Sequence, residues 1–237
     1  MERKTEGIVL KSIDYLENDK LVTLLTSEYG KITVRARGVK KTEAKLRFAA
    51  QPFCFAEYVF AEKDGRFTLV SATCHESFFE LADPDKLYAA YAVTELACIV
   101  APERSPCKGF FLTLAQTLRN LVNEDVQTSV IRYLLAVCKE SGFPLNAERC
   151  FSCGGELCGK SYFHFPTGSF SCAACRKGTA ASGSTVQLIR RYTGLPFEEV
   201  GEDDRKVRAI RLLKEYLAFH LDTDLKCLSA YIRQLLE

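Results

Sequence analysis

Four cysteines in the second half of the chain have the spacing of a metal site. Cys150 and Cys153 form one C-x2-C pair, and Cys172 and Cys175 form a second pair after 18 intervening residues. Two such pairs supply four thiolates that surround Zn²⁺ tetrahedrally, with Zn–S distances of about 2.3 Å. Because four cysteines close the coordination sphere, the spacing predicts a structural zinc ion. A catalytic zinc would keep one position open for water or substrate.

The segment around the two pairs predicts a zinc-ribbon-like knuckle over residues 148–178. Between the pairs, "YFHF" and "SFS" flank "PTG", which indicates a hairpin. Cys158 and His164 lie inside the knuckle and are alternative ligands.

One stretch of the knuckle, "GGELCGKS" (Gly154 to Ser161), matches the P-loop pattern G-x4-G-K-[ST]. A P-loop follows a buried strand and opens a helix whose N-terminus meets the phosphates. Here a cysteine pair precedes the pattern, and "YFHFPTG" follows it. We therefore expect glycines that turn the backbone beside a metal, and not a nucleotide site.

The other cysteines and the histidines do not form a catalytic pattern. None of the three histidines belongs to an HExxH or HxE pair, so we assign no catalytic residue and predict that the protein is not an enzyme. Five further cysteines lie among apolar residues and are expected to be small core side chains. These are Cys54, Cys74, Cys98, Cys138 and Cys227, while Cys107 follows a proline-rich turn.

A second cluster with binding chemistry is the basic stretch "KITVRARGVKKTEAKLRF". It holds seven cations against one acid, in a chain whose net charge is only +2. Its first residues alternate, so a strand would carry Lys31, Arg35 and Arg37 on one face and the apolar residues inward. Cations on a barrel face can follow the phosphates of a nucleic acid. The predicted DNA contacts are Lys31, Arg35, Arg37, Lys40, Lys41, Lys45 and Arg47.

The alternative without a binding function is that this stretch forms a solvated strand face followed by a disordered loop. Base stacking would need exposed aromatic side chains near the cations. The candidates are Tyr15, Tyr29, Phe48 and Phe67.

The elements that would position these residues change in type along the chain. Five strands are predicted at 6–15, 20–27, 31–37, 53–62 and 67–75, with Asp64-Gly65 as a hairpin turn. Five strands without a helix suit a small closed barrel, either an OB-fold or an SH3-like barrel. Helices are predicted at 83–101, 109–122, 124–142, 184–194, 202–221 and 225–237, the first with Asp83 as cap and Pro84 at its first position.

The predicted fold is therefore an α+β multidomain chain. An OB-fold barrel occupies residues 1–80, and an α-helical domain with the knuckle as an insert occupies 81–237. At 237 residues, 47% hydrophobic and 26% charged, the composition is that of a folded soluble protein. No apolar run approaches the roughly 20 residues of a membrane span, and the first residues lack the apolar core of a secretory signal. We expect a cytoplasmic protein whose eleven cysteines are reduced.

Three stretches together resemble the bacterial RecO family of DNA repair and recombination proteins. They are "GIVLKSIDYLENDKLVTLLTSEYGKITVRARGVKK", "LYAAYAVTEL" and the two cysteine pairs after "CKESGFPLN". The resemblance spans nearly the full length and implies an N-terminal OB-fold, a helical C-terminal domain and a zinc-ribbon-like insert. The family's basic positions carry over to "VRARGVKK", that is Arg35, Arg37, Lys40 and Lys41, and its zinc ligands to the four paired cysteines.

The resemblance also implies a role. Family members are non-enzymatic mediators that bind single- and double-stranded DNA and anneal complementary strands. With RecR, and often RecF, they help to load RecA onto DNA coated by single-strand binding protein, whose acidic C-terminal tail they contact. For this chain that implies action at the bacterial nucleoid. The tail site should lie in the helical domain beside basic residues such as Arg132, Arg205 or Arg211.

Other classes of function make different demands on the chain. A zinc-dependent hydrolase or nucleotide-binding enzyme would need clustered carboxylates or histidines, or a strand-framed P-loop. An RNA-binding OB protein would prefer RNA to DNA of matched sequence. A protein–protein scaffold with a structural zinc would use the basic loop to bind an acidic protein tail.

Overall fold

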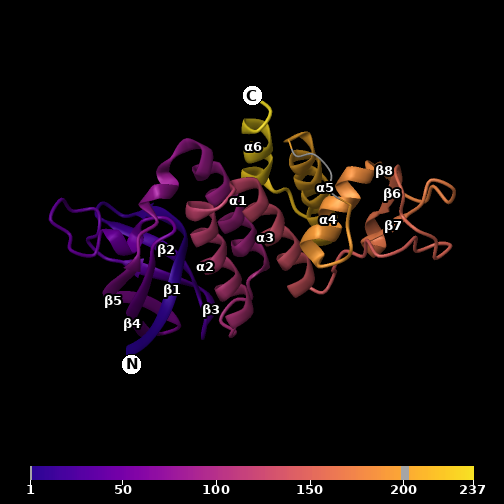
Figure 1. Cartoon of the computed structure of the whole chain (residues 1–237). Coiled ribbons are helices and arrows are strands. Elements are labelled where there is room, and N and C mark those ends of the chain that lie inside the picture. Colours follow the sequence, from indigo (N-terminus) through magenta and orange to yellow (C-terminus); the bar gives the residue numbers. More distant parts are fainter. Residues whose placement is uncertain (1, 199–202) are drawn as a thin grey trace. The chain divides into compact units, whose positions relative to one another are not determined.

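The computed structural model describes residues 2–198 and 203–237 and contains two compact units, Met1–Asn123 and Glu124–Glu237 (Figure 1). The first unit joins a strand barrel to the first two helices, and the second contains the knuckle with the remaining described helices. The domain boundary expected near residue 80 stays a prediction.

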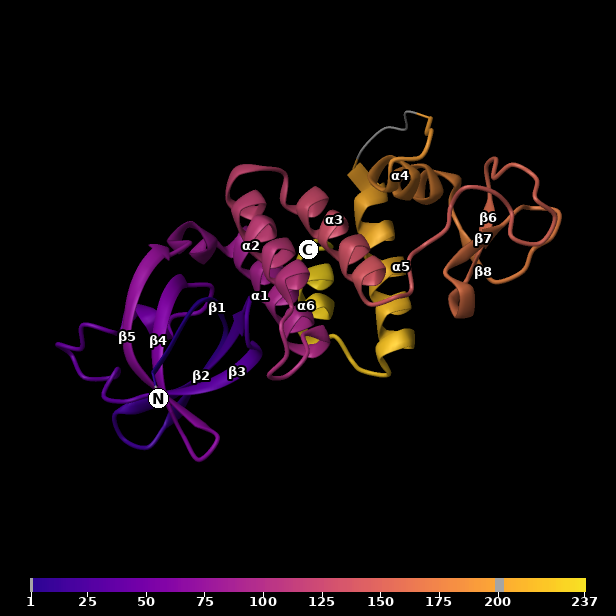
Figure 2. The same ribbon diagram turned by 90° about the horizontal axis from the view of Figure 1, so that it is seen from below.

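Five strands of the first unit form a closed barrel with the order β1-β2-β3-β5-β4 (Figure 2). Their bounds are β1 Glu2–Tyr15, β2 Asp19–Thr26, β3 Gly30–Ala36, β4 Phe55–Lys63 and β5 Arg66–Glu76. β3 and β5 pair in parallel, and the other neighbours are antiparallel. This is the five-stranded Greek-key barrel of the OB-fold. The OB-fold prediction is confirmed over the SH3-like alternative.

The long strand β1 closes the barrel because it pairs with two neighbours. Its first half pairs with β4 and its second half with β2, and the register shifts between Val9 and Lys11. Such a bulge bends a strand and increases its twist, as closure of a small barrel requires. The inward side chains of the strands form the barrel core together with a short 3-10 helix, Phe48–Ala50. The Tyr58 hydroxyl donates to the carbonyl of Ala49 and fixes that helix beneath the strands.

Two helices belong to the first unit, α1 (Pro84–Val100) and α2 (Lys108–Asn123), which pack against each other. The predicted cap is confirmed, since the Asp83 carboxylate accepts the backbone N–H of Asp85 and Pro84 starts the helix. The side chain of Arg119 on α2 binds Glu76 at the end of β5 with more than one hydrogen bond. This ion pair links the helical pair to the barrel.

Gly30 begins β3 at a point where no side chain fits. Its φ is +59°, and a Cβ there would overlap the carbonyl oxygens of Pro102 and Ser105 in the α1–α2 connection. Gly38 has a similar φ of +66°, but the nearest atom to its Cβ would be the Cδ of Lys41 at 3.9 Å. The two glycines share backbone strain and differ in the space around them.

We expect Gly30→Ala to lower the thermal stability of the chain more than Gly38→Ala. Both variants carry the left-handed penalty of about 1–2 kcal/mol. Gly30→Ala adds about 1–3 kcal/mol because it forces atoms into occupied space. The measurement is thermal unfolding of both variants followed by circular dichroism. An equal loss in the two would show that the α1–α2 connection does not lie against Gly30.

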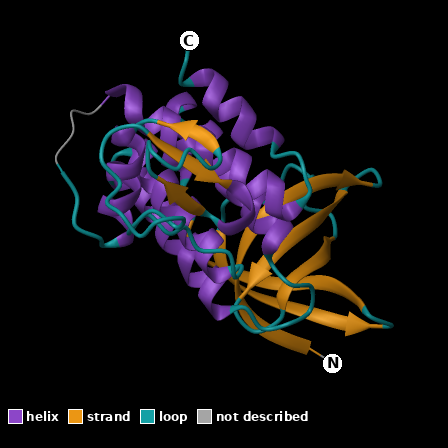
Figure 3. Cartoon of the chain, turned by 90° about the vertical axis from the view of Figure 1, so that its right-hand side faces the viewer, coloured by secondary structure: helices purple, strands orange, loops and turns teal. Residues whose placement is uncertain are grey.

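The second unit is built around α5, which contacts α3, α4 and α6. Figure 3 distinguishes the helices of the chain (purple) from its strands (orange). Its helices are α3 Val126–Glu140, α4 Gly183–Thr193, α5 Asp203–Leu221 and α6 Lys226–Gln234. The prediction for 202–221 began one residue earlier, at Glu202, which lies outside the described residues. A three-stranded sheet of order β7-β6-β8 forms the knuckle, with β6 Ser161–His164, β7 Ser169–Ser171 and β8 Thr179–Ala181. Among the described helices, none has both the length and the apolar character of a bilayer-spanning segment.

Candidate metal site and nucleic-acid interface

The knuckle brings the four paired cysteines together. The predicted hairpin is present as β6 and β7, and its Phe163 and Phe170 side chains are fully buried. The backbone N–H of Phe151 donates to the Phe170 carbonyl, which ties the first cysteine turn to β7. β7 leads directly into the second turn, because Cys172 follows its last residue. The third strand, β8, pairs with β6 beyond the predicted end of the insert and was not foreseen.

The geometry of the four thiols fits a tetrahedral metal. All four Sγ atoms of Cys150, Cys153, Cys172 and Cys175 lie within 4.8 Å of one another. Ligands about 2.3 Å from a tetrahedral centre are separated by roughly 3.8 Å. The Sγ atoms of Cys153 and Cys172 are 3.8 Å apart. We call these four residues the four-thiol site, and it can hold a metal ion.

Backbone hydrogen bonds favour the thiolate form of two of these four cysteines, Cys150 and Cys172. Burial opposes ionisation of Cys150, but N–H groups of Cys172, Cys153 and Ser152 outweigh it and lower its pKa to about 6. The Cys172 N–H lies 3.3 Å from the Cys150 Sγ. N–H groups of Cys175 and Ala174 lower the pKa of Cys172. Thiolates at such short range repel one another, so a bound cation is needed to keep all four ionised.

The two alternative ligands lie outside this cluster. Cys158 is exposed, and its Sγ is 3.7 Å from an oxygen of Glu156. The Nδ1 atom of His164 lies 2.9 Å from the Thr167 hydroxyl.

The P-loop-like stretch continues from Lys160 into strand β6 and does not open a helix. The knuckle therefore has the backbone turns expected beside a metal.

The expectation that Cys74 is a core residue is wrong. Cys74 is exposed, whereas Cys54, Cys107 and Cys138 are buried and Cys98 and Cys227 are partly buried. The register of β4 and β5 shifts twice, near Phe55 and near Phe60, so simple alternation does not give the face on which Cys74 lies.

Strand β3 has the two faces that its sequence predicts. Ile32, Val34 and Ala36 are buried, and the side chains between them point outward. The exposed residues of the following loop include Arg37, Lys41, Lys45 and Arg47. Of the seven predicted DNA contacts, only Lys31 and Arg35 are partly buried, and the other five are exposed.

Four of these cations make internal contacts that the sequence does not reveal. Arg47 is one of them, because its Nη2 donates to the Lys41 carbonyl at 2.8 Å. Arg35 donates to the Asp19 carboxylate from Nε at 2.7 Å and from Nη2 at 2.6 Å. The backbone N–H of Gly38, and then Arg35, lower the pKa of Asp19. Lys40 binds the Asp14 carboxylate at 2.7 Å, and the Lys31 ammonium donates to the carbonyl of Cys98 at 2.6 Å. Arg37 and Lys45 make no ion pair with the described residues.

A groove of about 640 Å³ lies beside β3, and we call it the barrel groove. Of the seven predicted DNA contacts, Arg35 and Arg37 line it. Five cations and one acid line it, and three of these cations, Lys63, Arg66 and Arg104, were missed in the sequence. They come from the β4–β5 hairpin and the α1–α2 connection. The complete lining is Tyr15, Leu21, Thr33, Arg35, Arg37, Lys63, Asp64, Gly65, Arg66, Phe67, Thr68 and Arg104. A hairpin turn flanked by Lys and Arg was the only signal for two of the missed residues.

Two of the four candidate stacking aromatics belong to the barrel groove. Tyr15 is 39% exposed, with the Arg35 guanidinium 5.3 Å from its ring centroid. Phe67 is buried, with the guanidinium of Arg104 5.3 Å from its ring centroid. Tyr29 and Phe48 are partly buried against the barrel core. Tyr15 is therefore the candidate with an accessible ring.

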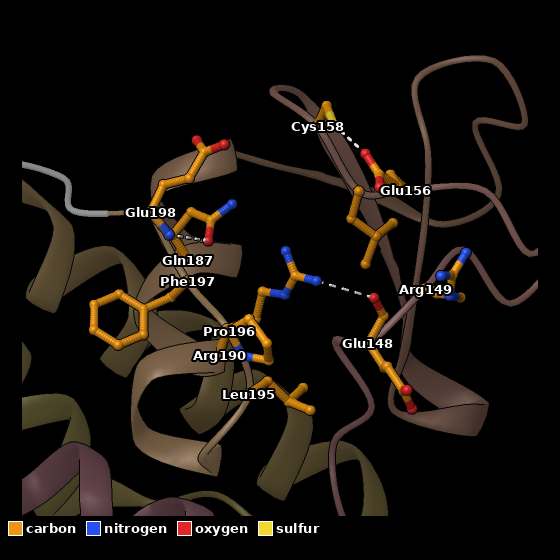
Figure 4. Close-up of a pocket in the computed structure, with 11 residues that line it drawn as sticks. Glu148, Arg149, Glu156, Cys158, Gln187, Arg190, Leu195, Pro196, Phe197 and Glu198 are labelled. Carbon is orange, nitrogen blue, oxygen red and sulfur yellow. Dashed lines mark hydrogen bonds between the residues drawn. The ribbon is translucent and has the colours of Figure 1, made fainter.

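A separate pocket of about 410 Å³ lies in the second unit between the knuckle and α4 (Figure 4). The charged residues that line this pocket have both signs. Its acids are Glu148, Glu156 and Glu198, and its cations are Arg149 and Arg190. The Arg190 guanidinium donates to the carbonyl of Glu148 at 3.2 Å, and the Glu198 N–H donates to the Gln187 side chain at 3.0 Å. This pocket lacks the excess of cations that lines the barrel groove.

The predicted tail-binding arginines lie in different settings within the second unit. Arg132 pairs with Glu124 at 2.8 Å and lies over the Tyr192 ring. Arg211 is exposed, while the Nη1 atom of Arg205 is buried without a hydrogen-bond partner among the described residues. No contact between the three arginines appears among the described interactions.

Comparisons with known proteins agree with this architecture. The family model described as "Recombination protein O N terminal" matches residues 1–78, and the one described as "Recombination protein O C terminal" matches residues 81–229. The DNA repair protein RecO of Bacillus pumilus is 32% identical over 227 residues, covering 92% of this chain and 88% of that protein. The DNA repair protein RecO of Pelotomaculum thermopropionicum is 31% identical over 233 residues, covering 94% and 91%.

A third relative, the DNA repair protein RecO of Clostridium acetobutylicum, is 30% identical over 202 residues, covering 83% of this chain and 82% of that protein. The matches thus include the barrel, the helices and the knuckle. The chain belongs to the RecO family of recombination and DNA repair proteins.

Proposed function

We propose that this chain is a non-enzymatic mediator of recombinational repair. It binds single- and double-stranded DNA, anneals complementary strands and, with RecR, helps to load RecA onto DNA coated by single-strand binding protein. The observation that carries the proposal is the barrel groove, with five cations and one acid over the face of an OB-fold. RecF is a further proposed partner, and the bacterial cytoplasm at the nucleoid is the proposed location.

The charge and position of the groove support DNA binding. The proposed contacts are Lys31, Arg35, Arg37, Lys40, Lys41, Lys45 and Arg47. Arg37 and Lys41 are exposed at the end of β3, where they can approach phosphates without first breaking an ion pair. Arg35 and Lys40 must exchange Asp19 and Asp14 for phosphates, and Lys31 must release the carbonyl of Cys98.

A groove that contacts phosphates binds any base sequence, because phosphate contacts position a strand without reading it. Annealing follows from the same property. Two complementary strands repel each other as polyanions, and cations that neutralise the phosphates of one strand lower the barrier to approach of the other.

The metal in this proposal is a structural Zn²⁺ held by Cys150, Cys153, Cys172 and Cys175. Thiolates are soft ligands, and a tetrahedral set of four is typical of structural zinc. When bound, the ion cross-links the two cysteine turns of a knuckle that otherwise has only a small core. The groove residues all belong to the first unit, so the ion is proposed to act on folding of the knuckle and not on DNA contact.

The acidic tail of single-strand binding protein is proposed to bind the second unit near the basic residues of α3 and α5. Arg211 supports this idea, because it is exposed and its guanidinium can donate to a carboxylate. Arg132 would have to exchange Glu124 for the tail.

The experiment that tests the DNA proposal is fluorescence anisotropy of a labelled single strand across a salt series. If about four phosphates are neutralised, log K should fall against log salt with a slope near −3, that is about −0.7 for each phosphate. Unlabelled DNA and RNA of matched sequence compete in parallel. Clearly tighter binding of the RNA competitor would favour an RNA-binding OB protein. Binding of neither nucleic acid would favour a protein scaffold.

A further inference from the structure

The connection between α1 and α2, residues 101–107, continues the barrel sheet along β3. The Lys31 N–H donates to the Pro102 carbonyl at 2.8 Å, and the Arg104 N–H donates to the Lys31 carbonyl at 3.3 Å. Further along, the Cys107 N–H donates to the Ser27 carbonyl at 3.2 Å. β5 pairs with β3 at only two positions, Val34 and Arg35. The connection therefore covers the first half of a strand edge whose second half β5 covers.

This connection places Arg104 on the barrel groove. The Arg104 backbone is left-handed, with φ at +52°, and its side chain reaches across to the β4–β5 hairpin. There its Nη2 donates to the Gly65 carbonyl at 2.5 Å, and the guanidinium lies over the Phe67 ring. The residue remains exposed. Two side-chain contacts to the β4–β5 hairpin thus hold a charged group at a defined place on the groove wall.

The guanidinium of Arg104 keeps most of its donors for a ligand. An arginine side chain has five N–H donors in a planar fork that suits phosphate oxygens. One hydrogen bond from this side chain to the described residues is present, to Gly65. Stacking on an aromatic ring leaves the edge of the guanidinium open for hydrogen bonds.

Lys31, the neighbouring cation on β3, contacts other parts of the protein and does not line the barrel groove. The Lys31 ammonium is bound to the Cys98 carbonyl near the end of α1 and lies 3.7 Å from Glu103, and its side chain is only 17% exposed. A cation at the C-terminus of a helix is stabilised by the exposed carbonyls there. Lys31 therefore anchors α1 to the barrel, while the connection that follows α1 brings a different cation to the groove.

We propose that the α1–α2 connection completes the nucleic-acid groove of the barrel and that Arg104, which it carries, binds a backbone phosphate of the strand lying there. The inference rests on the proposed DNA binding and extends it to a residue outside the barrel sequence. It also makes the first helical pair part of the binding surface.

The test compares Arg104→Ala with Lys108→Ala in the full-length chain by the same anisotropy salt series. Lys108 is an exposed cation four residues further on and does not line the groove. Loss of one phosphate contact should weaken binding roughly fourfold near 0.15 M salt and make the slope shallower by about 0.7. Lys108→Ala should change the affinity less than twofold and leave the salt slope unchanged within experimental error. Arg104→Lys keeps the charge and should keep the slope while losing the fork geometry.

Separate outcomes decide between the inference and the function on which it rests. Wild-type slope and affinity retained in Arg104→Ala would overturn the inference, as would an equal loss in Lys108→Ala, because net charge would then explain both. A wild type that binds no DNA would overturn the proposed function and this inference together. Thermal unfolding of each variant is measured alongside. If Arg104→Ala lowered affinity without changing the slope, its role would be to hold the hairpin and the phosphate contact would be refuted.

Discussion

Cys172→Ser is expected to abolish metal binding and to unfold the knuckle. The wild-type chain should carry one zinc ion, and the variant should carry none after dialysis against a weak chelator. The effect is large because structural zinc contributes apparent binding free energies of about 10–16 kcal/mol in small zinc domains, where binding and folding are coupled. Three remaining thiolates would leave the site open to water. Protease cleavage between residues 148 and 178 should rise sharply in the variant.

Cys158→Ser is the matched control for this prediction. Cys158 lies in the same knuckle, but its Sγ is near Glu156 and outside the four-thiol site. This variant should keep the metal and resist protease like the wild type. Retention of a full equivalent of zinc by Cys172→Ser, or its loss from Cys158→Ser, would contradict the assignment. DNA binding of Cys172→Ser should keep the wild-type salt slope, since the groove residues belong to the first unit.

The combined variant Arg35/Arg37/Lys40/Lys41→Ala is expected to lose DNA binding roughly 200-fold near 0.15 M salt. Each phosphate contact to a single strand contributes a salt-dependent factor of about four at this concentration, and four contacts multiply. The slope of log K against log salt should become shallower by about 2.8. Anisotropy of the same labelled strand measures both quantities.

Two further variants make this result interpretable. Arg35→Ala leaves Asp19, which is 8% exposed, without its ion-pair partner, so the combined variant can also lose stability. Arg37/Lys41→Ala breaks no ion pair and should lose about 15-fold in affinity and about 1.4 in slope. Removal of four exposed cations elsewhere tests for an effect of net charge alone. This control is Lys4/Lys108/Lys139/Lys226→Ala. Equal losses in the control and the combined variant would refute a DNA site at the barrel.

Much of the fold could be predicted because the signals are local. Period-two alternation in "KITVRAR" gave the two faces of β3, and Asp83 with Pro84 marked the start of α1. The Asp64-Gly65 turn gave the β4–β5 hairpin. Each of these depends on backbone preferences of a few neighbouring residues, so the sequence alone carries the information.

The metal site was predicted for the same reason. Each C-x2-C turn places two thiols together by local geometry, and a hairpin between the turns brings the pairs face to face. The spacing favoured these four cysteines over Cys158 and His164, and both of those lie outside the cluster. Cys74 shows the limit of local reasoning, since register shifts in β4 and β5 decide which side of the sheet it faces.

The sequence by itself determined the composition of this protein's two candidate sites: four paired thiols, and a run of cations that begins on a strand. Only the tertiary structure decided which of these charged side chains are available to a ligand. Lys40 meets Asp14 and Lys31 meets the carbonyl of Cys98, although they are separated by 26 and 67 residues. It also brought Lys63, Arg66 and Arg104 to the groove. The reason is physical. A thiol pair forms within one turn, whereas the electrostatic environment of a surface charge depends on every segment that the fold packs beside it.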